Sequence, residues 1–364
     1  MTTPETTPAA PAATPWPRLG LRWGLLAAMA AAVAGFFALS LAVGSVAIPL
    51  DAVIAILFDD ADQKRSWSHI IHAIRLPRAL TAVLAGAALS ASGLQMQTLF
   101  RNPLADPFIL GISAGASLGV ALVVLGTGVT GAGLLAGLGL IGHIGVVIAA
   151  VAGAAAVLGL VLLVGRRVQN NMTLLILGLM FGYLTGAIVS VLLYFSIPEQ
   201  VQTYVLWTFG SFGAVTWSQM VFLAPVALAG LAIAVLLVKP LNALLLGETY
   251  ARSMGLKVRQ ARLWIILSAA LLAGAVTAYC GPIGFLGVAV PHLCRALFNT
   301  SDHRVLLPAS IMMGAALALV ADLVARLPGS QATLPLNAVT ALIGAPVVTW
   351  IILRRRDLRQ AFAS

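Results

Sequence analysis

The chain has 364 residues, of which 60% are hydrophobic and only 9% are charged. A soluble globular domain is nearer half apolar and a quarter charged, so this composition excludes one and indicates a polytopic membrane protein. The formal net charge of +10 does not indicate nucleic-acid binding, because the basic residues stand at the ends of apolar runs rather than in one patch. We therefore expect the chain to lie in a lipid bilayer and not to bind nucleic acid.

The start of the chain differs in composition from the rest. Residues 1–17 are rich in Thr, Ala and Pro and cannot bury enough apolar surface to fold, so we expect a disordered cytoplasmic tail. The apolar run after Arg22 stays uncharged up to Asp51, which is far longer than the ~7–15 residues of a signal-peptide core. This run therefore predicts a first membrane helix rather than a cleaved signal.

Uncharged runs also predict the other crossings, since one helix needs about 20 apolar residues to span a bilayer. The run between Asp106 and Arg166 is too long for one helix, and its glycine-rich segment 126–133 supplies a turn between two. In chain order the predicted crossings are 23–46, 79–100, 108–126, 134–164, 172–195, 216–238, 262–280, 281–298, 304–325 and 334–353. We therefore predict an all-α fold, with a transmembrane domain over 18–358 and a cytoplasmic tail over 359–364.

The crossing at 281–298 has an unusual composition. Gly281, Pro282, Gly284 and Gly287 predict an extended or broken segment, followed by a short helix from about Val288. Irregular backbone at membrane depth persists only where protein covers it or where it lines a cavity. A simple kinked helix is the alternative.

The distribution of basic residues predicts the orientation. With a cytoplasmic start, only five basic residues fall outside, namely Lys64, Arg65, Arg75, Arg78 and Arg326. Because basic loops resist translocation, both termini are expected in the cytoplasm. The family resemblance described below implies that the membrane is a bacterial inner membrane.

The chain lacks the residues that several kinds of active membrane protein need. None of its lysines, Lys64, Lys239 and Lys257, follows the glycine of a phosphate-binding loop, so we expect no ATPase activity and no enzyme. Asp322 is the one acid deep enough for an ion relay, which gives an ion-coupled secondary transporter little support. No polar cluster suggests a membrane enzyme, and no cofactor is expected.

Cys280, His292 and Cys294 are the one grouping that suggests a metal site. Both cysteines stand inside apolar runs, where small buried residues are the simpler interpretation. We therefore assign no metal.

The segment 245–258 is the most informative of the predicted cytoplasmic loops. Glu248 in a first helical turn favours the helix dipole, and Gly255 can adopt the left-handed conformation that ends a helix. The apolar side chains on this short helix suit insertion into a protein groove, with Arg252 at the rim; they are Leu246, Tyr250, Met254 and Leu256. An interfacial helix lying on lipid is an equal alternative from spacing alone.

Five ordered motifs resemble the FecCD/BtuC family, the membrane subunits of type II ABC importers for ferric siderophores, haem and cobalamin. The resemblance covers roughly residues 20–355. The motifs are Arg75-Leu-Pro-Arg78, Gly93–Pro107, Gly247–Leu256, Gly281–Gly287 with Pro291 and His292, and His303–Pro308.

The resemblance implies a homodimer of ten-helix subunits, two ABC ATPase subunits below it and a periplasmic substrate-binding protein above it. ATP would drive alternating access, with haem as the expected cargo and a ferric siderophore or cobalamin as the alternative. The residues expected to couple to the ATPase are Gly247, Glu248, Tyr250, Ala251, Arg252, Met254, Gly255 and Leu256.

The resemblance also implies docking and gating roles. Arg75, Arg78 and Arg326 match arginines that meet glutamates of the binding protein, a role for which the guanidinium fork is suited. A snorkelling arginine at a helix end is the alternative for each.

Asp322 falls in a family motif, which favours structural pairing over an ion relay. The cytoplasmic gates are expected at Asn102, Pro103, Leu104, Asn170 and Asn171, although the second gate departs from the family's usual small hydroxyl residues.

Overall fold

The computed structural model describes residues 19–58, 64–126, 143–165, 171–326 and 333–354. Within these ranges every regular element is a helix and none is a strand, which confirms the all-α prediction. The predicted tails 1–17 and 359–364 lie outside the described residues. The boundary between tail and domain therefore stays a prediction.

The described residues form a series of helices and helical turns. In chain order they are α1 (Leu19–Ala42), α2 (Leu50–Phe58), α3 (Arg65–His69), the π-helical turn η1 (Ile70–Arg75), α4 (Leu76–Leu99), the 3-10 turn η2 (Pro107–Leu110), α5 (Ile112–Val124), α8 (His143–Gly165), α9 (Asn171–Tyr194), α10 (Pro198–Thr208), α11 (Trp217–Leu236), α12 (Val238–Leu245), α13 (Glu248–Ser253), α14 (Val258–Cys280), α15 (Leu286–Phe298), α16 (His303–Ala325) and α17 (Leu336–Arg354).

Ten apolar helices correspond to the ten predicted crossings. Among the described residues, 6 helices are long and apolar enough to cross a membrane, and the four shorter apolar helices are Ile112–Val124, Gly145–Val161, Leu286–Phe298 and Leu336–Thr349. Each overlaps one predicted segment. The crossing predicted at 108–126 is wrong in extent, because η2 and Gly111 interrupt the α-helix and α5 has only 13 residues.

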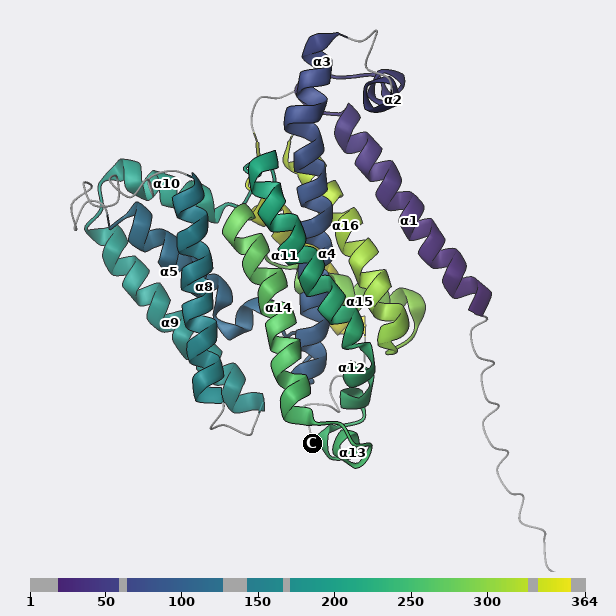
Figure 1. Cartoon of the computed structure of the whole chain (residues 1–364), viewed down its shortest axis with the longest axis vertical. Coiled ribbons are helices and arrows are strands. Elements are labelled where there is room, and N and C mark those ends of the chain that lie inside the picture. Colours follow the sequence, from purple (N-terminus) through teal and green to yellow (C-terminus); the bar gives the residue numbers. More distant parts are fainter. Residues whose placement is uncertain (1–18, 59–63, 127–142, 166–170, 327–332, 355–364) are drawn as a thin grey trace, which may run out of the picture.

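The second crossing is much longer than the predicted 79–100. α3, η1 and α4 form one helical run of 35 residues, Arg65–Leu99. At 1.5 Å per residue this run is about 50 Å long, which exceeds the ~30 Å hydrocarbon core. The prediction failed because it began the helix after the last charged residue, whereas charge marks depth and not the end of a helix. In Figure 1 the extension, labelled α3, stands at the upper end of the molecule.

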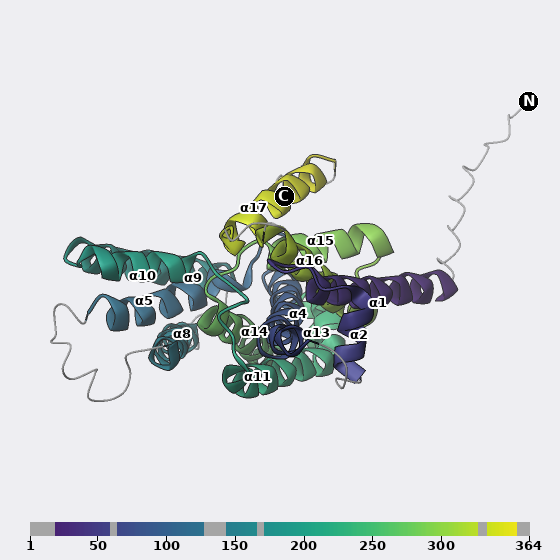
Figure 2. The same ribbon diagram turned by 90° about the horizontal axis from the view of Figure 1, so that it is seen from above.

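α4 is the central helix of the molecule. Figures 1 and 2 show it surrounded by α11, α14, α15 and α16, and it contacts all four. Nearly every residue from Ala79 to Leu99 is buried. The helices approach so closely because small residues face one another: a Cβ at Gly86 would overlap the carbonyl oxygen of Gly314 on α16.

A second group of helices lies beside this central bundle. α5, α8, α9 and α10 lie together to the left in Figure 2, and the buried side chains of α5 and α8 share a hydrophobic core with α4, α12 and α14. Figure 1 places α2, α3 and α10 at the upper end, and α12 and α13 at the lower end. α1 begins on the side of α13 and rises toward α2.

The close approach of α4 to α15 gives a test of this packing. A Cβ at Gly93 would overlap the carbonyl oxygen of Gly287, so Gly93→Ala is expected to destabilise the protein by about 1–3 kcal/mol. Gly35→Ala on α1 is the matched control, because nothing lies within 4 Å of a Cβ there. Thermal unfolding in detergent measures both; equal melting temperatures for the two variants would contradict the packing.

Candidate functional site

Two of the three predicted docking arginines, Arg78 and Arg326, converge on one carboxylate at the upper end of the molecule. Asp322, 1% exposed in its side chain, accepts from the Nε of Arg78 at 2.9 Å and forms an ion pair with Arg78 Nη2, also at 2.9 Å. Arg326 pairs with the other carboxylate oxygen from one helical turn away. This confirms the expectation that Asp322 has a structural partner. We call Arg75, Arg78, Arg326 and Asp322 the outer cluster.

Arg75 and Arg326 of the outer cluster hold the end of α1. Arg75 is 5% exposed and donates to the carbonyl oxygens of Leu41 at 2.6 Å and Ala42 at 2.8 Å. Arg326 donates to the carbonyl and hydroxyl oxygens of Ser40, at 3.0 and 2.6 Å. The last carbonyls of a helix have no partner within it, so these guanidinium groups cap α1 from outside.

Exposure separates the three arginines. The side chain of Arg78 is 18% exposed, against 9% for Arg326. Arg78 and Asp322 also line a cavity of about 300 Å³ at this end, together with residues of the α10–α11 connection such as Ser211 and Phe212. Of the arginines, Arg78 is therefore the one that a partner reaches most easily, and docking by all three stays a prediction.

The discontinuous helix is present as predicted. α14 ends at Cys280, Gly281 has a φ of 76°, and α15 begins at Leu286, close to the predicted start. Phe285 also has a positive φ of 68°, a strained conformation for a residue with a side chain. The broken segment therefore departs from helical geometry at two positions, Gly281 and Phe285, rather than at one kink.

Protein groups satisfy the backbone of the broken segment. The Cys280 carbonyl accepts from Ser211 N at 2.8 Å, and the N–H of Gly284 donates to Asn337 Oδ1 at 3.0 Å. Asn337 also donates its backbone N–H to the carbonyl of Phe209. The start of α17 thus covers the break, as irregular backbone at this depth requires. No sequence signal marked Asn337 for this role.

The first predicted gate is attached to the middle of α15. His292 donates from Nε2 to the carbonyl of Pro103 at 2.8 Å, and Asn102 Oδ1 accepts from Leu104 N at 2.9 Å. Leu104 is 43% exposed. Asn102, Pro103 and Leu104 therefore form one compact turn that is hydrogen-bonded to α15. Their gating role stays a prediction.

The second predicted gate is only partly described. Asn171 is the first residue of α9, and its side chain is not among those described. Asn170 lies outside the described residues. The described residues therefore do not define the position of the second gate relative to the first.

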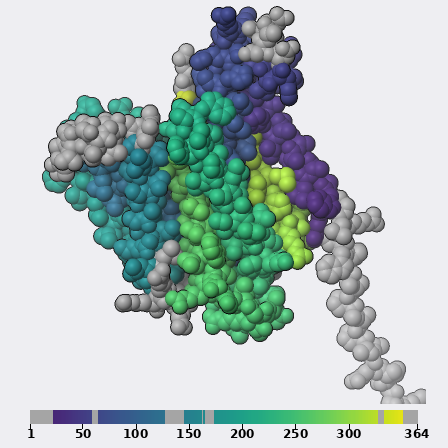
Figure 3. All heavy atoms as spheres, viewed as in Figure 1, coloured from purple at the N-terminus to yellow at the C-terminus, as the bar shows by residue number. Residues whose placement is uncertain are grey.

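The predicted coupling helix is α13, at the lower end of the molecule. It begins after Gly247 and ends where Gly255 adopts a φ of 85°, as predicted. Three of the four proposed anchors project outward, with Leu246 62%, Tyr250 53% and Met254 59% exposed. Figure 3 shows this segment as a bulge at the bottom of the space-filling surface.

The fourth anchor and the remaining coupling residues fasten α13 to the body. Leu256 is half-buried against the hydrophobic core that α12 and α14 share with α5 and α8, and Ala251 is fully buried. Glu248 accepts from Arg262 Nη2 at 2.8 Å, on the first turns of α14, and faces Arg252 at 3.6 Å. α13 therefore presents an apolar outer face on a base that is bonded to α14.

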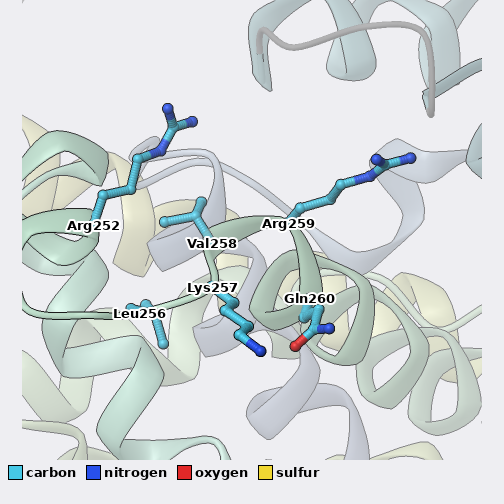
Figure 4. A pocket seen from close by; sticks show the side chains of 6 residues that line it. All are labelled: Arg252, Leu256, Lys257, Val258, Arg259 and Gln260. Carbon is cyan, nitrogen blue, oxygen red and sulfur yellow. The ribbon is translucent and has the colours of Figure 1, made fainter.

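Beside α13 lies an open pocket of about 430 Å³ with a basic lining. It is formed by Arg252, Leu256, Lys257, Val258, Arg259 and Gln260. In Figure 4 the side chains of Arg252 and Arg259 extend to one side and those of Lys257 and Gln260 to the other. This surface suits a partner that combines apolar contacts with acidic groups.

The outer cluster gives the second test. Asp322→Asn removes the one carboxylate that Arg78 and Arg326 share, which leaves two part-buried cations facing each other. Breaking a buried pair in this way is expected to cost about 3–5 kcal/mol of stability. Asp51→Asn, on the exposed first turn of α2, is the control and should cost less than about 1 kcal/mol. An equal fall in thermal stability for both variants would show that Asp322 is not a structural centre.

Comparison with known protein families gives one extended match. A family model described as the FecCD transport family matches residues 31–354. The match includes the outer cluster, both gates, the broken segment and α13.

Individual relatives cover most of the chain. The hemin transport system permease protein HmuU of Yersinia pestis is 40% identical over 304 residues, which are 83% of this chain and 88% of the relative. The vitamin B12 import system permease protein BtuC of Klebsiella pneumoniae is 42% identical over 287 residues, 78% of this chain and 82% of the relative. A solved metal-chelate type ABC transporter in an inward-facing conformation is 29% identical with a TM-score of 0.78, covering 91% of this chain and 99% of that one.

Proposed function

Because the chain belongs to the FecCD transport family, we propose that it moves haem from the periplasm to the cytoplasm by ATP-driven alternating access. The chain is a permease subunit of a type II ABC importer and a multi-pass membrane protein. The identity of the cargo, haem, is the more specific part of the proposal. It is supported by the hemin permease relative, whose alignment extends over 304 residues, against 287 for the vitamin B12 permease relative.

Cobalamin is the second candidate cargo, and a ferric siderophore is the third. The vitamin B12 permease relative is 42% identical to this chain and the hemin permease relative 40%, so identity alone favours neither cargo. All three cargoes are large metal chelates, so the mechanical requirement on the permease is the same.

The proposed assembly is a homodimer of this chain with two ABC ATPase subunits and one periplasmic substrate-binding protein. The observation that carries the proposal is α13: a short helix with an exposed apolar face, a basic pocket beside it and a base bonded to α14. An amphipathic helix of this kind suits insertion into a groove on a partner. We propose that the ATPase provides that groove, which puts the α13 end and both termini in the cytoplasm.

The opposite end is the proposed docking surface for the binding protein. Arg78 is the proposed primary contact, because it keeps the most exposure in the outer cluster and lines the cavity there. Arg75 and Arg326 would then act by holding the end of α1 and by adding positive charge behind Arg78. Such charge steers association with an acidic partner.

Reconstitution tests the function directly. The chain, purified with its ATPase and placed in liposomes, should take up haem from its loaded binding protein only when ATP is present on the α13 side. Parallel assays with cyanocobalamin and a ferric siderophore identify the cargo. Uptake by the chain alone under a proton or sodium gradient would contradict the proposal and favour a secondary transporter.

Gly255 tests the coupling role of α13. Gly255→Val forces a β-branched residue into a left-handed conformation, which costs roughly 1–2 kcal/mol and reorients the end of the helix. We expect cargo moved per ATP to fall about fivefold or more. Gly255→Asn is the matched control, since Asn tolerates this conformation. Wild-type coupling in the Val variant would remove α13 from the mechanism.

A further inference from the structure

A chain of hydrogen bonds at the lower end joins the segment before α13 to two membrane helices. It runs from Thr98 in the last turn of α4, through His303 at the start of α16, to Asn242 on α12. It ends at the carboxylate of Asp302. None of these residues belongs to the docking, gate or coupling positions predicted from the sequence, and α12 leads directly into α13.

The direction of each hydrogen bond follows from the donors. The backbone N–H of His303 donates to Asn242 Oδ1 at 2.9 Å, which fixes the orientation of that amide. His303 Nδ1 lies 2.8 Å from the same oxygen and must therefore carry a proton. In a neutral ring Nε2 then accepts, and the single hydroxyl proton of Thr98 is shared between this nitrogen, 2.8 Å away, and the carbonyl oxygen of Leu94, 3.0 Å away.

The far end of the chain is a carboxylate with several donors. The amide nitrogen of Asn242 donates to Asp302 Oδ1 at 2.6 Å, and the N–H of Arg304 donates to the same oxygen at 2.9 Å. Burial opposes the charge of Asp302, but these hydrogen bonds hold its pKa below its ordinary value. The carboxylate is therefore a fixed acceptor at neutral pH.

Burial makes this chain costly to break. His303 is 1% exposed and Thr98 is 4% exposed, so a lost partner would leave a polar atom without water. By contrast, the other buried side chains of α12 are the apolar Leu241 and Leu244, whose contacts are not directional. The hydrogen bonds thus fix where α12 lies relative to α4 and α16.

The two membrane helices that receive this chain are joined at two further levels. In the middle their backbones meet at Gly86 and Gly314, and at the upper end Arg78 of α4 pairs with Asp322 of α16. α4 and α16 are therefore one two-helix unit that extends from α12 to the outer cluster.

We infer that Thr98, Asn242 and His303 are positioning residues that pass the displacement of α13 to the α4–α16 unit. The inference rests on the proposed function, in which the ATPase moves α13. The hydrogen bonds act through geometry alone: they make α12, α4 and α16 move together, so that ATPase motion reaches the outer cluster.

The experiment uses the reconstituted complex of permease, ATPase and binding protein. Thr98→Val removes the hydroxyl at constant size, whereas Thr98→Ser keeps it and is the matched control. We expect the Val variant to hydrolyse ATP at the wild-type rate but to move about fivefold less cargo per ATP, with the Ser variant close to wild type. The cargo is haem, or cyanocobalamin if the wild-type complex takes up only that. Melting temperature and dimer assembly are measured in parallel.

The outcomes separate the possible explanations. A wild-type complex that moves no cargo contradicts the proposed function. Wild-type uptake with unchanged cargo per ATP in Thr98→Val overturns the inference, and so does a parallel fall of ATP hydrolysis and uptake, which indicates a merely structural role. If Thr98→Val does not assemble, Asn242→Ala makes the same test, because it removes the link from the part-buried α12 side alone.

Discussion

The contact between α4 and α16 is the constraint on which the rest of the structure depends. Their backbones approach until no Cβ fits at Gly86 or Gly314. Inside a bilayer, apolar helices gain no hydrophobic free energy by meeting, so close packing and polar pairs must hold them. The pair Arg78–Asp322 at one end and the bond between Thr98 and His303 at the other supply those polar contacts. α1, α12 and α15 all attach to this unit, so its position fixes both functional ends.

The sequence predicts much of this fold because charge and apolar runs report depth in the membrane. All ten apolar helices among the described residues overlap predicted crossings, and glycine and proline at 281–287 predict the broken helix. The same reasoning misses elements that cross nothing. α10 and the extension Arg65–Arg75 lie in predicted external loops, since helices outside the bilayer need no uncharged run. η2 also escapes prediction, because no charge separates it from α5.

The sequence predicts which residues are functional better than it predicts which residues they contact. Glu248 and Gly255 identify α13, because a first-turn acid and a left-handed residue are local signals. The pairing of Arg78 with Asp322 joins residues that are far apart in the sequence, and no local pattern shows it. No local pattern predicts the contact between His303 and Asn242 either, because it forms only when the fold brings α12 to the start of α16.

The rigidity of the α4–α16 unit is the central claim, and a distance measurement between spin labels tests it most directly. Ser66→Cys on the extension of α4 and Ser301→Cys before α16 place labels at exposed positions at the two ends of the unit, with Cys280 and Cys294 replaced. Double electron–electron resonance, with both labels in one protomer of the complex, should give the same distance between the two labels, within about 2 Å, with and without ATP. A shift of about 5 Å, one helical turn, would show that α4 and α16 slide past each other and would contradict the account.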